Sequence, residues 1–210
     1  MTPISAREDV SALWLETLQR AMGRASHDVK DALNGVSVNL EVIRSRASRA
    51  DGAAGSVAPF GEAAAQQLER LTTLLEAMLA LSRVERAPTD VGVTLRRVVT
   101  LCGASASSHD APVRLRDDGA LGSRLTSVQG DLVRLALAAP LLDAVNGADA
   151  STRASEVICS LACDEDAVHV VIGATGGRAV MPESVTDVLR SAGIRWTEDK
   201  HDLSLAFPRV

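Results

Sequence analysis

The stretch that decides the fold is residues 15–47, LETLQRAMGRASHDVKDALNGVSVNLEVIRSRA. Its apolar residues recur at steps of mostly three and four, a near-heptad pattern typical of a helix packed along other helices. They are Leu15, Leu18, Met22, Ala25, Val29, Ala32, Val36, Leu40, Ile43 and Ala47. No proline interrupts the run, so the pattern predicts one helix of about 40 residues. Such a helix is too long to stand alone in a compact monomer, and it indicates a bundle or a coiled coil.

A second apolar helix is predicted over residues 62–85, after a loop marked by the turn residues Asp51, Gly52, Gly55, Pro59 and Gly61. Its wide apolar face consists of Leu68, Leu71, Leu74, Leu75, Met78, Leu79 and Leu81. One hairpin of two helices cannot cover the apolar stripes of both, whereas two paired hairpins form a four-helix bundle that does. We therefore expect a homodimer. The alternative is that the hairpin packs on the rest of its own chain.

The periodicity changes after Pro88, which ends the second helix. We therefore divide the chain into a helical hairpin, residues 1–87, and a second domain, residues 88–210. The pattern predicts helices over residues 91–102, 131–145 and 185–191, with Pro140 kinking or shortening the middle one. It predicts strands over residues 113–116, 157–162, 168–172, 194–196 and 203–207. Helices interleaved with largely antiparallel strands indicate an α+β fold, a long antiparallel helical hairpin followed by an α/β two-layer sandwich.

The composition excludes several functional classes. The 210 residues include 22 Lys or Arg and 27 Asp or Glu, and the net charge of −5 argues against an electrostatic grip on nucleic acid. Aromatic residues make up only 2% of the chain, which argues against a base-stacking surface. No segment approaches the ~20 apolar residues of a membrane span, and the first residues lack the apolar core of a signal peptide. We therefore expect a cytoplasmic protein that binds neither nucleic acid nor membrane.

The cysteines and three of the four histidines carry no recognisable site pattern. The cysteines are Cys102, Cys159 and Cys163, an odd number without a CxxC pair, so neither a disulfide framework nor a zinc site is indicated. We expect Cys159 and Cys163, which fall in an apolar stretch, to be buried structural thiols. His109, His169 and His201 show no metal-ligand spacing. His109 and His201 are expected to be solvated turn residues, and His169, within a predicted strand, to be satisfied structurally.

A polar stripe runs along one face of the first predicted helix, offset from the apolar stripe. Its members, at steps of four and three residues, are Arg20, Arg24, His27, Asp31 and Asn34. His27 would therefore point out of the bundle, with Asp28 beside it and Lys30 one turn further on. An exposed imidazole is a nucleophile near neutral pH, a nearby carboxylate can orient it and take up its proton, and cations can attract a phosphoryl group or an acidic partner. On spacing alone, the alternative is a solvated helix face that happens to carry one histidine.

Residues 26–33, SHDVKDAL, resemble the phosphoacceptor box of sensor histidine kinases. That box reads His, an acidic residue, two variable positions, Asn or Thr, Pro and Leu, and it lies on the first helix of a dimeric two-helix hairpin. The chain keeps the histidine, the acidic neighbour and the leucine. It departs at Ala32, where the family commonly has Pro, and at Asp31, where the family has the Asn or Thr that helps to place water for dephosphorylating a partner. The resemblance implies that His27 is the phosphoacceptor, while the change at Asp31 puts phosphatase activity in doubt.

The second domain resembles a degenerate copy of the ATP-binding domain of the same family. Residues 89–91 and 130–135 are similar to its first residues and to the start of its nucleotide-binding helix. That helix should carry a metal-holding asparagine, but residues 140–145, PLLDAV, contain none. The Asp-x-Gly that reads adenine corresponds to Ala174-Thr175-Gly176, and residues 181–183 start the next helix where the lid should be. The resemblance thus implies a domain that has lost ATP binding, and no cofactor or metal is expected in this chain.

The residues and the resemblance together predict a histidine phosphotransferase of a two-component phosphorelay. It would pass a phosphoryl group between the aspartates of response regulator receiver domains through His27, with Asp28 orienting and deprotonating the imidazole. Any Mg²⁺ would come from the receiver. The residues expected to meet the partner are Arg20, Arg24, Lys30, Asp31 and Asn34. Two alternatives stay open: an active histidine kinase with an atypical ATP site, and a non-catalytic pseudokinase that binds response regulators.

Overall fold

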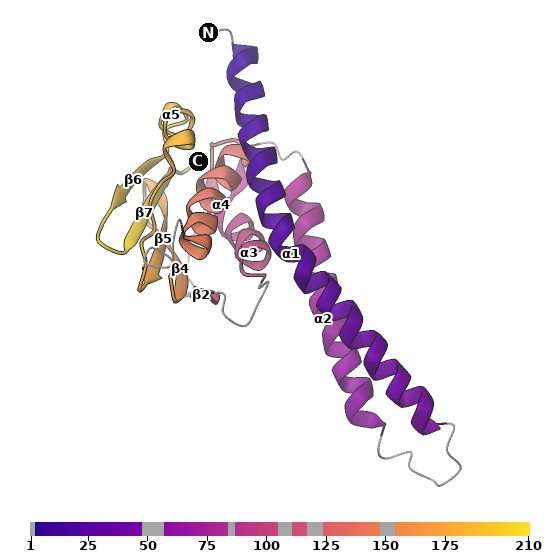
Figure 1. The fold of residues 1–210 in the computed structure, drawn as a ribbon. Helices are drawn as coiled ribbons and strands as arrows, with labels where there is room; N and C mark the ends of the chain where they lie inside the picture. The colour runs from indigo at the N-terminus through magenta and orange to yellow at the C-terminus, as the bar shows by residue number, and fades with distance from the viewer. Residues whose placement is uncertain (1–2, 48–56, 84–86, 105–110, 117–123, 148–153) are drawn as a thin grey trace.

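Two long antiparallel helices form the hairpin in the computed structural model of the chain. The structure describes residues 3–47, 57–83, 87–104, 111–116, 124–147 and 154–210, with side chains from residue 9 onward. Helices α1 (Pro3–Ala47) and α2 (Ala58–Ser82) lie side by side (Figure 1). α2 starts earlier than predicted because Pro59 occupies its first turn, where a missing N–H leaves no hydrogen bond unmade. The predicted hairpin is confirmed, while the predicted turn residues 51–55 lie outside the described residues.

The second part of the chain is an α/β sandwich. Its helices are α3 (Val91–Cys102), α4 (Gly130–Asn146) and α5 (Glu183–Ser191). Its strands are β1 (Thr89–Asp90), β2 (Val113–Arg116), β3 (Leu125–Thr126), β4 (Glu156–Cys163), β5 (Ala167–Thr175), β6 (Arg195–Glu198) and β7 (Asp202–Pro208). The main sheet has the order β2-β4-β5-β7-β6, in which β2 and β4 are parallel and the other neighbours antiparallel. α3 and α4 cover one face of this sheet (Figure 1), which confirms the predicted two-layer sandwich.

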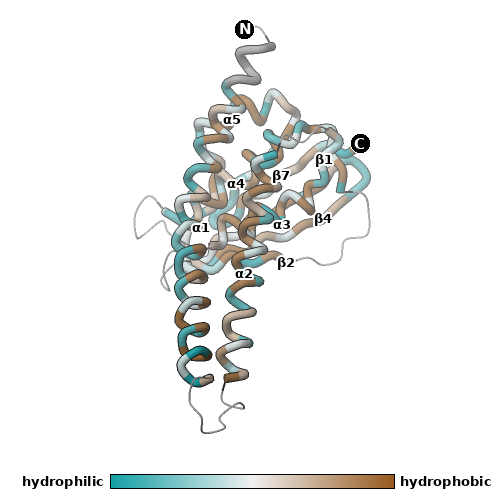
Figure 2. Tube along the Cα trace, turned by 90° about the vertical axis from the view of Figure 1, so that its right-hand side faces the viewer, coloured by the Kyte–Doolittle hydropathy of each residue, from teal (hydrophilic) through white to brown (hydrophobic). Residues whose placement is uncertain are grey.

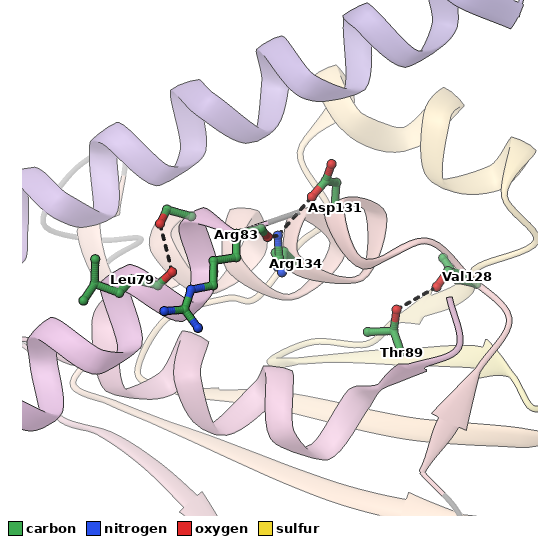
Figure 3. Close-up of polar contacts among 7 residues, drawn as sticks. Leu79, Arg83, Thr89, Val128, Asp131 and Arg134 are labelled. Atoms are coloured by element: carbon green, nitrogen blue, oxygen red, sulfur yellow. Dashed lines mark hydrogen bonds and ion pairs between the residues drawn. The ribbon is translucent and has the colours of Figure 1, made fainter. Parts of the chain in front are cut away.

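A short ladder between β1 and β3 was not predicted. Each strand has two residues, too few for a periodic signal, and they pair antiparallel with Thr89 opposite Thr126. The Thr89 hydroxyl donates to the Val128 carbonyl at 3.1 Å (Figure 3), and Asp90 caps α3 by accepting from the Val93 N–H at 2.8 Å. These bonds fix the position at which the chain passes from the hairpin into the sandwich.

Helix α4 is buried on nearly all sides. Thirteen of its 17 residues are buried, and a helix that is apolar all round needs cover on every side. The sheet covers one side and α1 covers the other (Figure 1). Pro140 does not shorten the helix, which continues to Asn146. Burial of the surrounding leucine and alanine side chains offsets the free-energy cost of the backbone hydrogen bond that a proline cannot make.

The two halves of α1 have different surroundings. In the first half, Trp14, Leu18, Ala21 and Ala25 belong to the same buried core as α3, α4 and the sheet. The second half projects past the sandwich together with the first part of α2 (Figures 1 and 2). The hairpin therefore packs partly on its own chain, and several large apolar side chains of α1 and α2 remain exposed. The homodimer stays a prediction.

Cys102 and Cys159 are buried in the sandwich core. Burial raises the pKa of each thiol to about 12, and for Cys102 the proximity of Cys159 contributes to that rise. Cys163, at the end of β4, is only half-buried. The burial of Cys159 agrees with the predicted structural role, whereas Cys163 only borders the core.

Arg134 of α4 is a buried cation that joins three helices. Its side chain is 1% exposed, and its Nη1 donates to the Arg83 carbonyl at 2.6 Å and to Asp131 Oδ1 at 3.0 Å (Figure 3). Its guanidinium also lies 6.0 Å from the ring centroid of Trp14 on α1. One side chain therefore ties the end of α2 and the start of α1 to α4.

Replacing Arg134 tests this junction. We expect Arg134→Met to lower the free energy of unfolding by about 2–3 kcal/mol, because charge-assisted hydrogen bonds to a backbone carbonyl and a carboxylate are lost. Urea unfolding followed by circular dichroism measures the change. Arg178→Met, which removes a half-exposed cation paired at 3.5 Å with Glu198, is the control and should change the value by less than about 1 kcal/mol. Equal effects of the two substitutions would contradict the assigned role.

Candidate functional site

His27 is exposed near the middle of α1. The helix is continuous through this position, so a rigid backbone presents the imidazole. Arg24, one turn earlier, still contacts the sandwich, whereas the helix beyond His27 projects past it (Figure 1). His27 therefore lies where α1 leaves the sandwich, with its ring open to solvent as the polar stripe predicted.

Arg20 and Arg24 contact the chain's own sandwich. Arg20 Nη2 donates to Asp143 Oδ1 at 2.5 Å, and Arg24 donates to Asn146 Oδ1 at 2.8 Å and to the Ala104 carbonyl at 3.3 Å. The first half of the polar stripe thus faces the end of α4 and not solvent alone, because α1 crosses α4 at this level. The role of Arg20 and Arg24 toward a partner stays a prediction. The structure adds a second role, which is to bind the sandwich of the same chain.

Asp28 points into the hairpin and is paired with Arg70 of α2. Arg70 Nη2 donates to Asp28 Oδ2 at 2.7 Å; the Asp28 side chain is 7% exposed and that of Arg70 is 54% exposed. Successive residues on a helix point about 100° apart, so Asp28 is inside while His27 is outside. Sequence reasoning missed Arg70. The signal that could have found it is a carboxylate on a buried face of a helix, because such a group needs a charged partner.

The remaining members of the predicted site lie on the projecting part of α1. Lys30, Asp31 and Asn34 are exposed, in agreement with a surface that a partner can reach. Ala32, which stands where the kinase box commonly has proline, is buried at 1% exposure. A small residue at this position allows close approach of a neighbouring helix.

A cleft of about 410 Å³ opens beside Asp28, between α2 and the end of α3. Its polar lining includes the Asp28–Arg70 pair. The other lining residues are Gln66, Glu69, Thr73, Leu74, Thr100, Gly103 and Ala104. The cleft therefore lies on the side of α1 toward which Asp28 points.

The end of α4 is occupied by contacts within the chain. Ala144 is 1% exposed, and Asp143 and Asn146 accept hydrogen bonds from Arg20 and Arg24. The end of α4 thus binds α1 through these two side chains. The loss of ATP binding stays a prediction.

Two other histidines have structural partners. His169 on β5 bonds through Nε2 to Asp164 Oδ2 at 2.6 Å. The backbone N–H of Ala167, then His169 and the N–H of Asp166, lower the pKa of the Asp164 carboxyl to about 2. His201 Nδ1 lies 2.8 Å from the Gly177 carbonyl oxygen. His169 therefore has a structural partner, as predicted, and His201 is exposed, as expected of a solvated turn residue, while bonding to the backbone. His109 lies outside the described residues.

The part of the chain that the structure describes holds no group of three or more His, Cys, Asp or Glu side chains that could bind a metal ion. Within the same residues, no helix is both long and apolar enough to cross a membrane.

Comparisons with known proteins give structural likeness only. No protein-family model matches the chain, and no curated protein matches it. One similar solved structure is histidine kinase AdeS of Acinetobacter baumannii, with 14% identity over 87% of this chain and 97% of that chain and a TM-score of 0.36. Another is the histidine kinase domain of a blue-light activated kinase of Erythrobacter litoralis, with 16% identity over 90% of this chain and 94% of that chain and a TM-score of 0.41. A third is histidine kinase ThkA in complex with response regulator TrrA, with 13% identity over 100% of this chain and 68% of that chain and a TM-score of 0.41. Likeness at this distance carries no argument about activity.

The Asp28–Arg70 pair gives a test of the site's construction. We expect Arg70→Gln to lower the free energy of unfolding by about 1–2 kcal/mol, because the buried Asp28 carboxylate loses a charged donor. Urea unfolding measures the change. Arg44→Gln, which breaks an ion pair with Glu41 whose side chains are both well exposed, serves as the control and should cost less than about 0.5 kcal/mol. If Arg70→Gln costs no more than Arg44→Gln, the pair does not hold the hairpin.

Proposed function

We propose that the chain is a histidine phosphotransferase of a two-component phosphorelay with His27 as the phosphoacceptor. The observation that carries the proposal is an exposed imidazole on the rigid α1 helix, within the SHDVKDAL box, whose acidic neighbour is held inside the hairpin by Arg70. The construction suits a nucleophile whose surroundings are fixed.

The proposed cycle consists of two transfers to and from receiver domains. The unprotonated imidazole nitrogen of His27 attacks the phosphorus of an aspartyl phosphate, the N–P bond forms as the P–O bond breaks, and the aspartate leaves as a carboxylate. A second receiver aspartate then takes the phosphoryl group by the reverse step. Because Arg70 holds the Asp28 carboxylate inside the hairpin, Asp28 would have to turn outward as a receiver docks in order to orient the imidazole and take up its proton. Any Mg²⁺ belongs to the receiver.

The partner would contact both α1 and the sandwich. Arg24 lies one turn from His27 and binds two neutral oxygens, of Asn146 and Ala104, and these bonds leave its positive charge in place. Lys30, also one turn from His27, adds a second cation on the exposed helix. Two cations beside the nucleophile favour an approaching phosphoryl group and an acidic receiver surface.

Phosphoryl transfer from a labelled receiver tests the proposal. With a radiolabelled phosphorylated receiver as the donor, we expect the label on the wild-type chain and then on a second receiver, and a loss of more than about 100-fold in His27→Ala because the nucleophile is gone. His169→Ala is the matched control, since it removes another half-exposed histidine with a carboxylate partner, and it should transfer normally. Transfer that persists in His27→Ala excludes this residue as the phosphoacceptor.

The same assay separates the two alternatives. A histidine kinase would label His27 from ATP without any receiver donor. A non-catalytic pseudokinase would bind receivers equally well in the wild type and in His27→Ala, with no phosphohistidine from either donor. Either pattern would replace the transferase proposal.

We further propose that the chain is a homodimer through the exposed apolar stripe of the hairpin. Leu15, Met22, Leu33 and Leu40 are all exposed and follow one another at 7, 11 and 7 residues, which places them within about 20° on the helix. α2 carries a similar exposed set, Leu68, Leu75 and Leu79. Exposed leucines aligned on two neighbouring helices are the surface that a four-helix bundle buries.

Charge substitutions in the stripe test the dimer. We expect Leu40→Glu to shift the chain toward monomer by at least about tenfold in dissociation constant, because a charge would be buried at the interface. Light scattering coupled to gel filtration gives the mass. The control is Val38→Glu, since Val38 is also exposed, at 64% against 54% for Leu40, but lies well off the stripe, and it should leave the mass unchanged. Monomeric wild-type protein, or equal effects of the two variants, would contradict the proposed interface.

A further inference from the structure

A glycine without a packing partner lies one turn before His27 on α1. Gly23 is exposed, and a Cβ placed on it would meet no atom of the described residues within 4 Å, its own helix backbone and chain neighbours aside. Glycine in the middle of a helix is less favourable than alanine, because it loses more backbone freedom on folding. Gly35, the other glycine of α1, packs against α2, where a Cβ would already lie 3.4 Å from Gln67 Cγ. Helix packing thus accounts for Gly35 but not for Gly23.

Gly23 belongs to the exposed face of α1 that carries His27. The two residues are four apart in sequence, which leaves them about 40° apart around the helix. Helical side chains lean toward the N-terminus, so the imidazole of His27 leans over the turn that contains Gly23. Met22 of the exposed apolar stripe lies about 100° from Gly23, so the proposed dimer interface does not cover this position. The space beside the imidazole is therefore open to a partner.

The neighbours of Gly23 on this face are a side chain folded onto the helix and a cation. The Ser26 hydroxyl donates to the Gly23 carbonyl oxygen at 2.7 Å, so it lies against the helix backbone. Lys30 is exposed and lies about 20° from Gly23 around the helix, on the far side of His27 along the chain. The bare backbone beside the imidazole thus adjoins a positive charge, which suits an anionic partner.

Phosphoryl transfer makes close approach necessary at this turn. The attacking nitrogen and the phosphorus must come within about 3–3.5 Å of each other before reaction. The histidine side chain is short, so the surface of the partner must come near the backbone of α1 where the imidazole leans. A side chain at position 23 would occupy that space, whereas glycine leaves it free.

We propose that Gly23 is a docking residue that determines how closely a receiver domain can approach His27. The receiver would place main chain or a small side chain against the Gly23 turn, with its aspartyl phosphate at the imidazole and its acidic surface toward Lys30. This inference rests on the proposed transfer function and names a contact that the same site makes with its partner. The lower helix stability at Gly23 is then the consequence of close docking.

Gly23→Ala tests the proposal, because it should change stability and docking in opposite directions. We expect a higher urea unfolding midpoint, since alanine favours the helix. In transfer from a radiolabelled phosphorylated receiver, we expect the half-saturating receiver concentration to rise about tenfold, because the added methyl group overlaps the docked receiver. The maximal rate should stay unchanged, since the nucleophile is intact. Gly23→Gln, which is larger and also favours the helix, should raise the half-saturating concentration further.

Gly61→Ala is the matched control. Gly61 lies in the first part of α2, and a Cβ placed on it also meets nothing within 4 Å. It precedes Arg70 by nine residues, which places it about 13 Å along the hairpin from the level of Asp28. This variant should keep or raise the urea midpoint and leave transfer unchanged. Equal weakening of docking by Gly61→Ala and Gly23→Ala would overturn the proposal.

The remaining outcomes separate this inference from the function on which it rests. A wild-type chain that accepts no label from the receiver would overturn both. A wild type that transfers, together with a Gly23→Ala variant of the same half-saturating concentration, would overturn only the role of Gly23. A lower urea midpoint for Gly23→Ala would also overturn that role, because the fold itself would then require the glycine.

Discussion

The need to cover α4 on both sides organises the whole molecule. The sheet covers only one side of this nearly fully buried helix, so a second apolar surface must lie against the other. The first half of α1 provides that surface with Trp14, Leu18, Ala21 and Ala25, and the two alanines are small enough for close packing of the helices. Once α1 is placed against α4, the polar bonds from Arg20 and Arg24 follow, and His27 falls at the point where α1 leaves the sandwich. Burial of one helix therefore sets the position of the candidate nucleophile.

In this arrangement, some apolar residues of α1 pack within the chain, and others form the surface of the proposed dimer. A single heptad-like pattern runs from Leu15 to Ala47, yet Leu18 and Ala25 are buried within the chain while Leu15 and Leu40 are exposed. The two sets lie on different sides of one helix, because steps of seven keep one line and a step of three moves to the next. The intramolecular contact and the proposed dimer are therefore compatible. Packing of the hairpin on its own chain, which the sequence offered as an alternative to a homodimer, does not exclude the homodimer.

The elements could be predicted because their signals are local, whereas the contacts of the site join residues far apart. Residues 91–102 and 113–116 have the predicted bounds, since Asp90 caps the helix and the strand alternates between more and less buried residues. The exposure of His27 also followed from helical spacing. The partners did not, because Arg20 is 123 residues from Asp143 and Asp28 is 42 residues from Arg70. A buried cation such as Arg134 leaves no periodic signal, since its residue type predicts a surface position.

The contact between α1 and α4 also bears on the choice between a transferase and a kinase. A kinase must bring its histidine to a nucleotide held by its own second domain and then to a receiver, so the helix and the domain need more than one relative position. A transferase needs only one, because donor and acceptor both arrive from outside at the same exposed imidazole. Here Asp143 and Asn146 at the end of α4 are hydrogen-bonded to α1, and the contact between Arg134 and Trp14 adds to that placement. One such position of α1 against the sandwich, with His27 in solvent, is all that the proposed transfer between receivers would require.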